Sequence, residues 1–203
     1  MTMDITSDPF ANDGAAAPST GSQPWIHQHG DEIQKFGTVR LFPIALSYEA
    51  RMQSCQLLNQ VLADSMILHS HYKKHHWLVR GHTFYQLHLL LDKHAGEQLD
   101  LIDLIAERVQ TLGGIAIADP RHVAEVTVIP RPPDGAEEVP AMLSRLLEEH
   151  ELIIGRVRDA ITATADNRDD GTNDLLMSDV LRRHELQVWF LAEHLVDTPA
   201  TRA

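Results

Sequence analysis

A long connection between two pairs of helical patterns constrains the fold of this chain more than any other feature. The connection covers residues 115–138, "IAIADPRHVAEVTVIPRPPDGAEE", and contains four prolines. Apolar residues recur at helical spacing in four stretches: about residues 47–79, 84–112, 139–164 and 174–195. Gly81 separates the first pair, and the turn "DNRDDGTND" separates the second. No stretch shows the apolar–polar alternation that is typical of strands, so we expect an all-α fold.

Each pair of helices is joined by a short turn, while the connection between the pairs is long enough to cross a bundle. Two helical hairpins joined by one long crossover are the topology of a ferritin-like four-helix bundle. We expect this bundle over residues 46–198, with a short helix near His122–Val126 in the crossover. Residues 1–45 are expected to form an N-terminal tail, disordered up to about residue 24 because Ala, Ser, Thr, Gly, Asp and Pro dominate it, and residues 199–203 a short C-terminal tail.

Charge and cysteine content narrow the class of protein. The formal net charge is -12 at pH 7, which argues against strong non-specific attraction to nucleic acid or anionic membranes. Cys55 is the single cysteine, so no intrachain disulfide can form. No apolar run reaches the length of a membrane span, and the N-terminal residues lack the basic and apolar segments of a secretory signal. We therefore expect a cytoplasmic protein without a membrane partner.

Carboxylates and imidazoles repeat along one stripe of the second helical stretch. His88 and Asp92 are one turn apart, and so are Asp103 and Glu107. Eleven residues, or about three turns, lead from Asp92 to Asp103, so both pairs share a face. Imidazole and carboxylate together suit iron, manganese and zinc. His76, near the end of the first helical stretch, lies just before the turn that leads into this stripe.

Helix length excludes one metal site made from both pairs of the same chain. A rise of about 1.5 Å per residue places Asp92 and Asp103 roughly 16 Å apart, whereas metal–ligand bonds are about 2 Å long. The third helical stretch offers Glu148, Glu149 and His150, which we expect mostly on a solvated face. A second copy of the chain, packed antiparallel across a two-fold axis, would complete both half-sites at once. The alternative is that these are ordinary polar residues of an amphipathic helix; their repetition on one stripe favours metal ligands.

The spacing of these residues resembles that of the Dps family of mini-ferritins, the DNA-binding proteins from starved cells. The family pattern has a His-Trp pair at the end of the first helix, followed by His, Asp, Asp and Glu at intervals of twelve, four, eleven and four residues. All of these positions match in this chain: His76-Trp77, His88, Asp92, Asp103 and Glu107. The segment "LIAERVQTLGG" is also similar to the family, and the likeness extends over about residues 47–195.

The resemblance implies a dodecameric hollow shell with an interior iron store and ferroxidase sites at its two-fold interfaces. In each site, one chain would supply His76, His88 and Asp92, and its neighbour would supply Asp103 and Glu107. The implied reaction is the oxidation of Fe(II), with hydrogen peroxide as the preferred oxidant in many members. Storage of the Fe(III) mineral would then protect the cell from oxidative damage. Zinc and manganese are alternative occupants of the same ligands.

A nucleoid-associated protein whose main role is DNA protection is the alternative within the same family. Some members bind DNA through Lys- and Arg-rich tails, but here no Lys or Arg precedes Lys35, and the C-terminal "DTPATRA" has a single Arg. We therefore do not expect DNA binding through the tails. A plain structural bundle, or a shell with silent zinc-filled sites, is the third hypothesis. The usual intrasubunit di-iron site is excluded, because no histidine has a glutamate three residues before it.

The acidic turn before the fourth helical stretch resembles the family's segment near the three-fold pores. Asp169, Asp170 and Asp174 are therefore candidates for an iron entry pore. The spacing from Asp174 to Trp189 is one residue longer than the family pattern, which leaves this assignment open.

Histidines outside the motif form the last group of candidates. They are His69, His71, His75, His82 and His94 around the motif, and His27 and His29, with Asp31 and Glu32, near the N-terminus. We expect most of them on the surface, with an outer shell or a transit route at His75 and His94 as the alternative. The N-terminal group is either a polar linker or an extra metal site, as in some long-tailed members of the family. Trp77 is either a sacrificial electron donor beside the site or a core aromatic residue.

Overall fold

The computed structural model describes residue 24 and residues 26–197. The elements, in chain order, are α1 (Tyr48–Leu78), α2 (Phe84–Thr111), α3 (Pro120–Val126), α4 (Val139–Asp166), α5 (Asp170–Asp174), the π-helix η1 (Leu175–Leu181), α6 (Arg182–Ala192) and the 3-10 helix η2 (Glu193–Leu195). The chain divides into two units, residues 1–33 and 34–203, and the described part of the first has no helix or strand. The tails expected at residues 1–24 and 199–203 lie, apart from residue 24, outside the described residues.

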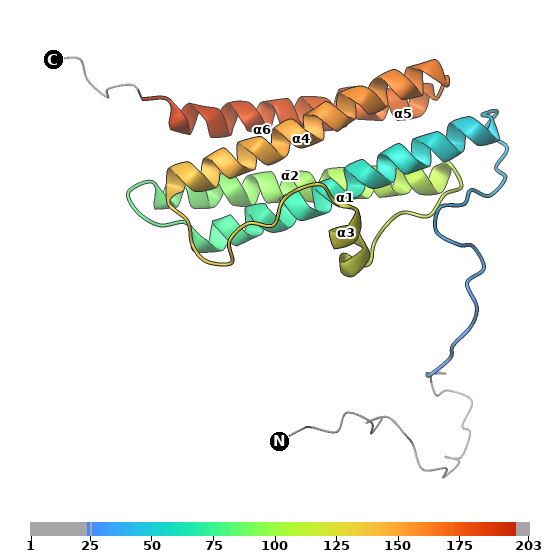
Figure 1. The fold of residues 1–203 in the computed structure, drawn as a ribbon, viewed down its shortest axis with the longest axis horizontal. Helices are drawn as coiled ribbons and strands as arrows, with labels where there is room; N and C mark the ends of the chain where they lie inside the picture. The colour runs from blue at the N-terminus through green and yellow to red at the C-terminus, as the bar shows by residue number, and fades with distance from the viewer. Residues whose placement is uncertain (1–23, 25, 198–203) are drawn as a thin grey trace, which may run out of the picture. The chain divides into compact units, whose positions relative to one another are not determined.

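Two helical hairpins make up the bundle of the second unit (Figure 1). α1 and α2 lie side by side in one hairpin, and α4 packs with the run from α5 to η2 in the other. Fully buried apolar side chains come from both hairpins, among them Leu62, Leu91, Leu146 and Val180. The expected all-α, ferritin-like topology with a long crossover is confirmed. Among the described residues, no helix is both long and apolar enough to cross a membrane.

The ends of α1 follow sequence signals. Ser47 caps the first turn, where its hydroxyl oxygen accepts a hydrogen bond from the Ala50 N–H at 3.1 Å. α1 ends at Leu78, and Gly81 then adopts a φ of +98°, a conformation that L side chains rarely take. The tight turn places the first residues of α2 against the last residues of α1. This turn therefore positions the end of α1, which carries His76, beside the start of α2, which carries His88.

The segment before α1 is bonded to the end of α2. The Arg40 N–H donates to the Gly113 carbonyl at 2.8 Å, and the Gln34 Nε2 donates to the same oxygen at 2.9 Å. Arg51 of α1 is buried, and its guanidinium donates to the Arg40 carbonyl and, at 3.3 Å, to the Leu112 carbonyl. Gly113 sits at the centre of these contacts with a φ of +86°.

Replacing Gly113 with alanine is expected to lower the free energy of unfolding by at least about 1–2 kcal/mol, because the positive φ strains an L residue. In addition, the new Cβ would lie 2.5 Å from the Arg40 carbonyl oxygen, so the backbone must shift. Gly155→Ala is the matched control, since Gly155 is exposed within α4 and a Cβ there meets nothing. The control should be neutral or stabilising by up to about 1 kcal/mol. Urea unfolding measures both, and equal midpoints would contradict the strain at Gly113.

Side chains of α1 hold the first half of the crossover. The buried Asp64 carboxylate accepts from the Thr127 hydroxyl at 2.7 Å and from the Val128 N–H at 2.9 Å. Asn59 donates to the Ile115 carbonyl at 3.0 Å, and its own oxygen accepts from the Ile117 N–H at 2.8 Å. Residues that follow α2 are thereby fixed along α1, although most of them are not helical.

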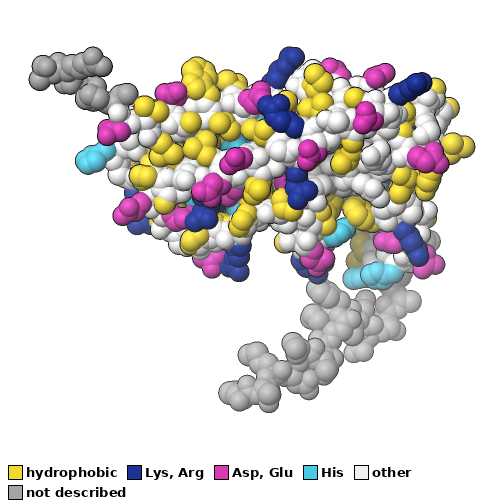
Figure 2. All heavy atoms as spheres, turned by 45° about the horizontal axis from the view of Figure 1, so that its top comes forward, with side chains coloured by type: hydrophobic (Ala, Val, Ile, Leu, Met, Phe, Trp, Pro, Cys, Tyr) yellow, Lys and Arg dark blue, Asp and Glu magenta, His cyan; other side chains and the backbone are white. Residues whose placement is uncertain are grey.

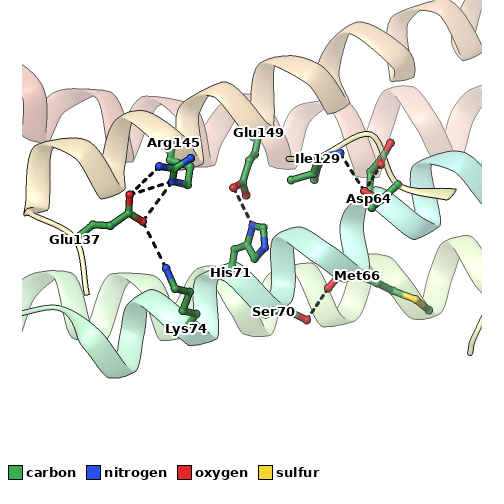
Figure 3. A network of polar contacts seen from close by, with 10 residues as sticks. Asp64, Met66, Ser70, His71, Lys74, Ile129, Glu137, Arg145 and Glu149 are labelled. Carbon is green, nitrogen blue, oxygen red and sulfur yellow. Dashed lines mark hydrogen bonds and ion pairs between the residues drawn. The ribbon is translucent and has the colours of Figure 1, made fainter. Parts of the chain in front are cut away.

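Ion pairs fix the second half of the crossover (Figure 3). Glu137 pairs with Lys74 of α1 at 3.5 Å and with Arg145 of α4 at 2.8 Å. One turn farther along α4, the Glu149 carboxylate is 2.8 Å from the His71 Nδ1 of α1. These contacts tie the two hairpins together on the side of the bundle that the crossover follows.

The last helix begins earlier than the sequence pattern suggested, at Asp170 rather than near Asp174. Arg108 of α2 holds its start: the guanidinium is 2.6 Å from Asp169 Oδ1 and donates to the Thr172 hydroxyl at 2.9 Å. This ion pair, in which Asp169 is buried, links the end of α2 to the beginning of the last helix.

A π-helical segment interrupts the last helix. The segment, η1, lies between Asp174 and Trp189, the interval that the sequence suggests is one residue longer than in the family. A single π turn takes up one extra residue. Leu191, beyond this segment, is fully buried, so the helix keeps its core face despite the longer spacing.

Candidate metal centre

The turn between α1 and α2 brings His76 and His88 face to face. Their rings are stacked, with centroids 3.8 Å apart and planes inclined by 19°. The His76 Nδ1–H donates to the His88 carbonyl oxygen at 2.8 Å, and the His88 Nδ1–H donates to the His76 carbonyl oxygen at 2.9 Å. The ring of Phe84, in the first turn of α2, stacks against His88 with centroids 5.1 Å apart. The hairpin therefore fixes the orientation of both imidazoles.

These hydrogen bonds decide which ring nitrogen of each histidine carries a proton. A carbonyl oxygen can only accept, so both Nδ1 atoms are protonated. In the neutral rings both Nε2 atoms then keep a lone pair. Histidines that bind metals commonly donate Nδ1–H to a backbone carbonyl in this way. The pair His76 and His88 is thus oriented to offer two Nε2 atoms to a metal ion.

Asp92 lies beside this pair and is held by a lysine. Its Oδ1 is 3.8 Å from the His76 Nε2 and 2.6 Å from the Lys73 Nζ. The hydrogen bond from Lys73 lowers the pKa of Asp92 below its ordinary value. The carboxylate is therefore charged at neutral pH, and it remains about half exposed. Lys73 was not among the residues predicted for the site, although its position three residues before His76 places it on the same part of α1.

Asp103 and Glu107 lie farther along α2 and are exposed. Asp103 borders a surface hollow that is also lined by Leu99 and Leu104. Both leucines are exposed, as is Leu89 nearer the start of α2. A strip of exposed leucines with carboxylates between them is suited to contact with another protein surface.

No three His, Cys, Asp or Glu side chains converge on a single metal position within the described residues. The structure brings His76, His88 and Asp92 together and leaves Asp103 and Glu107 apart. The five-residue site therefore stays a prediction that requires a second chain.

The surface positions expected for several other candidates are wrong. His75 and His94 are 1% exposed, and Glu149 and His150 are buried rather than solvated, while Glu148 is exposed as expected. Burial lowers the pKa of both His75 and His94 to about 4 and raises the pKa of Glu149. These groups belong to the interior of the bundle, where an unpaired charge is costly.

Helical spacing could have identified these buried polar residues. His150 follows Leu143 by seven residues and precedes Ile153 by three, and both apolar neighbours are fully buried. His94 follows the buried Leu91 by three residues. Residue type misled the prediction, because position on the apolar stripe decides burial even for histidine.

The remaining candidates divide by exposure. Trp77 is 70% exposed in the single chain, so the expectation of a core aromatic residue is wrong. His82 is exposed, and His69 and His71 are partly buried. Asp169 is buried in its ion pair with Arg108, whereas Asp170 and Asp174 are exposed. The N-terminal candidates are exposed within the described part of their own unit: His27, His29, Asp31 and Glu32.

Comparison with known proteins places this chain in a family. A model of the ferritin-like domain in the ferritin family matches residues 55–201. An uncharacterized protein of Kitasatospora aureofaciens is 64% identical over 144 residues, which are 71% of this chain and 96% of that protein. A nutrient stress-induced DNA-binding protein of Synechococcus is 29% identical over 163 residues, which are 80% of this chain and 92% of that protein.

The same relationship holds for solved structures. DpsC from Streptomyces coelicolor aligns with a TM-score of 0.84 and 69% sequence identity, over 85% of this chain and 100% of that chain. The family model alone covers well over half of the chain. The chain therefore belongs to the Dps family of ferritin-like proteins.

Proposed function

We propose that this protein is a ferroxidase and iron-storage mini-ferritin, with its sites formed between two chains of a dodecameric shell. The observation that carries this proposal is the paired His76 and His88, whose Nδ1 protons are bonded to backbone carbonyls so that both Nε2 lone pairs remain for a metal. A histidine pair with this arrangement needs carboxylates to complete an iron site. Asp92 lies at its side, and a neighbouring chain would add Asp103 and Glu107.

Fe(II) is the substrate of the proposed reaction. The two imidazoles give affinity for Fe(II), while the carboxylates favour the more highly charged Fe(III) product. The overall change is 2 Fe(II) + H₂O₂ + 2 H⁺ giving 2 Fe(III) + 2 H₂O. The Lys73 Nζ is 2.6 Å from Asp92 Oδ1, and this ion pair would have to break when Asp92 binds Fe(II). Zinc or manganese would compete for the same residues, since they accept the same ligand types.

The distribution of exposed groups supports an interface between chains. Asp103 and Glu107 are exposed together with Leu99 and Leu104 on α2. A two-fold interface repeats every contact, so two chains would generate two equal sites. Removal of Fe(II) and peroxide together, in the cytoplasm, would protect the cell from oxidative damage.

Two measurements on the wild-type protein test this proposal. The native mass should correspond to about twelve chains of 22.8 kDa, roughly 270 kDa. Addition of Fe(II) and hydrogen peroxide should then produce Fe(III) absorbance much faster than in buffer, and the iron should stay with the protein. A native mass of one or two chains would contradict the shell. Silent sites filled with zinc would show an intact shell without rapid oxidation.

DNA protection as the main role is the second candidate, and the DNA-binding name of the Synechococcus relative favours it. Against it, each chain carries a net charge of -12, and a shell multiplies that charge. On the face drawn in Figure 2, Lys and Arg side chains are interspersed with Asp and Glu. We expect no gel shift of linear duplex DNA at pH 7.5 and physiological salt. A tight, metal-independent shift would instead indicate a basic surface, with Lys73, Lys74 and Arg80 as the first residues to replace.

A further inference from the structure

The centre of the bundle holds a tyrosine that is hydrogen-bonded to two histidines in series. Tyr72 of α1 is fully buried, and its Oη is 2.5 Å from the Nε2 of His150 in α4. The Nδ1 of His150 is 2.9 Å from the Nδ1 of His184 in α6. Within the described residues, the buried Nε2 of His184 has no hydrogen-bond partner. Three helices thus contribute to one chain of hydrogen-bonded side chains inside the core.

The bond lengths indicate the direction of the protons in this chain. The phenol donates across the short 2.5 Å contact to His150, because its other acceptor, the Gln187 Oε1, is 3.4 Å away and already accepts from Gln98 at 2.9 Å. The other nitrogen of His150 then carries a proton and donates to His184. Burial raises the pKa of Tyr72 well above 10 and lowers the pKa of His150 well below 6.5. Burial also lowers the pKa of His184, to about 3, so all three groups are neutral at rest.

A buried phenol with a neutral imidazole at hydrogen-bond distance can lose an electron without forming a phenol radical cation, because its proton can move to the imidazole. Oxidation makes the phenolic proton strongly acidic, and that proton needs an acceptor within hydrogen-bond reach. The His150 Nε2 is such an acceptor at 2.5 Å. The positive charge that His150 gains can spread to His184 through their 2.9 Å bond. No proton has to leave the bundle during this step.

Tyr72 also lies next to the candidate metal centre. It precedes His76 by four residues on α1, which is about one turn or 6 Å of rise. On the side of α2, its ring packs edge-on against His94 with centroids 5.4 Å apart. His94 follows Asp92 by two residues. The tyrosine is therefore adjacent, along both helices, to residues of the predicted ligand set, on their buried side.

We propose that Tyr72 is a redox residue that supplies one electron to peroxide during iron oxidation, with His150 as its proton acceptor. This inference rests on the proposed ferroxidase function. When a site holds a single Fe(II), the step is Fe(II) + Tyr–OH + His + H₂O₂ + 2 H⁺ giving Fe(III) + Tyr–O• + His–H⁺ + 2 H₂O. Iron and tyrosine each lose one electron, and both oxygens of the peroxide leave as water.

The benefit of this step lies in what it prevents. One electron from Fe(II) alone would split peroxide into water and a hydroxyl radical, whereas a second electron from Tyr72 completes its reduction to water. The next Fe(II) restores the resting state by Tyr–O• + His–H⁺ + Fe(II) giving Tyr–OH + His + Fe(III). Burial of Tyr72 keeps its radical away from other molecules in the meantime.

The chain permits a direct spectroscopic test, because it has three tyrosines. Tyr48 and Tyr85 are exposed, so both can be replaced by phenylalanine, leaving Tyr72 as the only tyrosine. This double variant, prepared with ring-deuterated tyrosine, is mixed with one Fe(II) per chain and excess hydrogen peroxide and frozen for electron paramagnetic resonance. We expect an organic radical whose hyperfine pattern narrows on deuteration. An unchanged pattern, or no organic radical while Fe(III) forms, would overturn the inference.

Tyr72→Phe keeps the ring and removes the hydroxyl, so it provides the complementary measurement. We expect loss of the tyrosyl signal and more trapped hydroxyl radical per Fe(III) formed, whereas Tyr85→Phe should match the wild type in both. A wild-type level of trapped radical in Tyr72→Phe would count against the proposal. If Tyr72→Phe does not fold, the isotope experiment decides alone. If the wild type forms no Fe(III), the ferroxidase function and this inference are both overturned. If it forms Fe(III) without a tyrosyl radical, only the role of Tyr72 is overturned.

Discussion

His88→Ala and Asp103→Ala are each expected to slow Fe(II) oxidation at least about 100-fold, because loss of a direct ligand should exceed the 10–100-fold effect of losing an outer-shell partner. The two residues lie roughly 16 Å apart along α2 of one chain, so no single ion can contact both. If both substitutions slow Fe(II) oxidation equally, the two residues act in the same site, and such a site must span two chains. Stopped-flow absorbance of Fe(III) with hydrogen peroxide measures the rate, and His82→Ala, at an exposed turn position, is the control.

Mixing the two variants then separates an intersubunit site from an intrasubunit one. In shells reassembled from equal amounts, half of the two-fold interfaces contain one chain of each kind. Each mixed interface has one intact site and one that lacks both residues, so about a quarter of the wild-type activity should return. Native mass spectrometry can establish that the shells are mixed. No recovery in verified mixed shells would mean that the two residues do not complete each other across an interface.

Acid is expected to destabilise the bundle through its buried histidines. Burial lowers the pKa of His184 to about 3, and that of His150 well below 6.5. Below pH 6.5 the unfolded chain binds protons that the folded chain excludes, so stability falls as pH decreases. The slope is about 1.4 kcal/mol per pH unit for each such histidine. For His184 it continues down to about pH 3, where the folded form also takes up its proton.

His184 alone should therefore remove about 2–3 kcal/mol between pH 6.5 and pH 4.5, and His150 should add to this loss. The raised pKa of Glu149 acts in the opposite direction, because the folded state then binds a proton before the unfolded state does. His184→Asn isolates the histidine effect, since its amide can accept from His150 but does not titrate. Urea midpoints at fixed protein concentration should depend less on pH in His184→Asn than in the wild type. His82→Asn is the matched control, and an unchanged slope in His184→Asn would contradict the assignment.

The helices and the topology could be predicted because their signals are local. The stripe that contains Leu58 and Leu62, the break at Gly81 and the long crossover together determine the two hairpins. The spacing of His76, His88 and Asp92 also placed these residues together, as the structure shows. Such predictions depend on helical periodicity and short turns alone.

Other features depend on contacts between distant segments. The bonds that protonate Nδ1 in His76 and His88 require the backbone of one helix end to face the ring on the other. Burial of His150 depends on Tyr72 and His184, which come from two other helices. Histidine and glutamate are usually exposed, so residue type pointed to the surface. Helical spacing indicates the buried face, but the partners that satisfy the buried polar atoms are not visible in the sequence.

The π-helical segment η1 has a consequence for comparing this chain with its relatives residue by residue. A one-residue insertion in a regular α-helix would turn everything beyond it by about 100°. The π turn within Leu175–Leu181 takes up one extra residue, and His184 and Leu191 beyond it are buried. Against a relative whose last helix is α-helical throughout, an alignment must therefore change its offset by one inside this segment. Roles assigned to Asp169 or Asp174 on one side, and to Trp189 on the other, cannot be transferred from such a relative in a single ungapped frame.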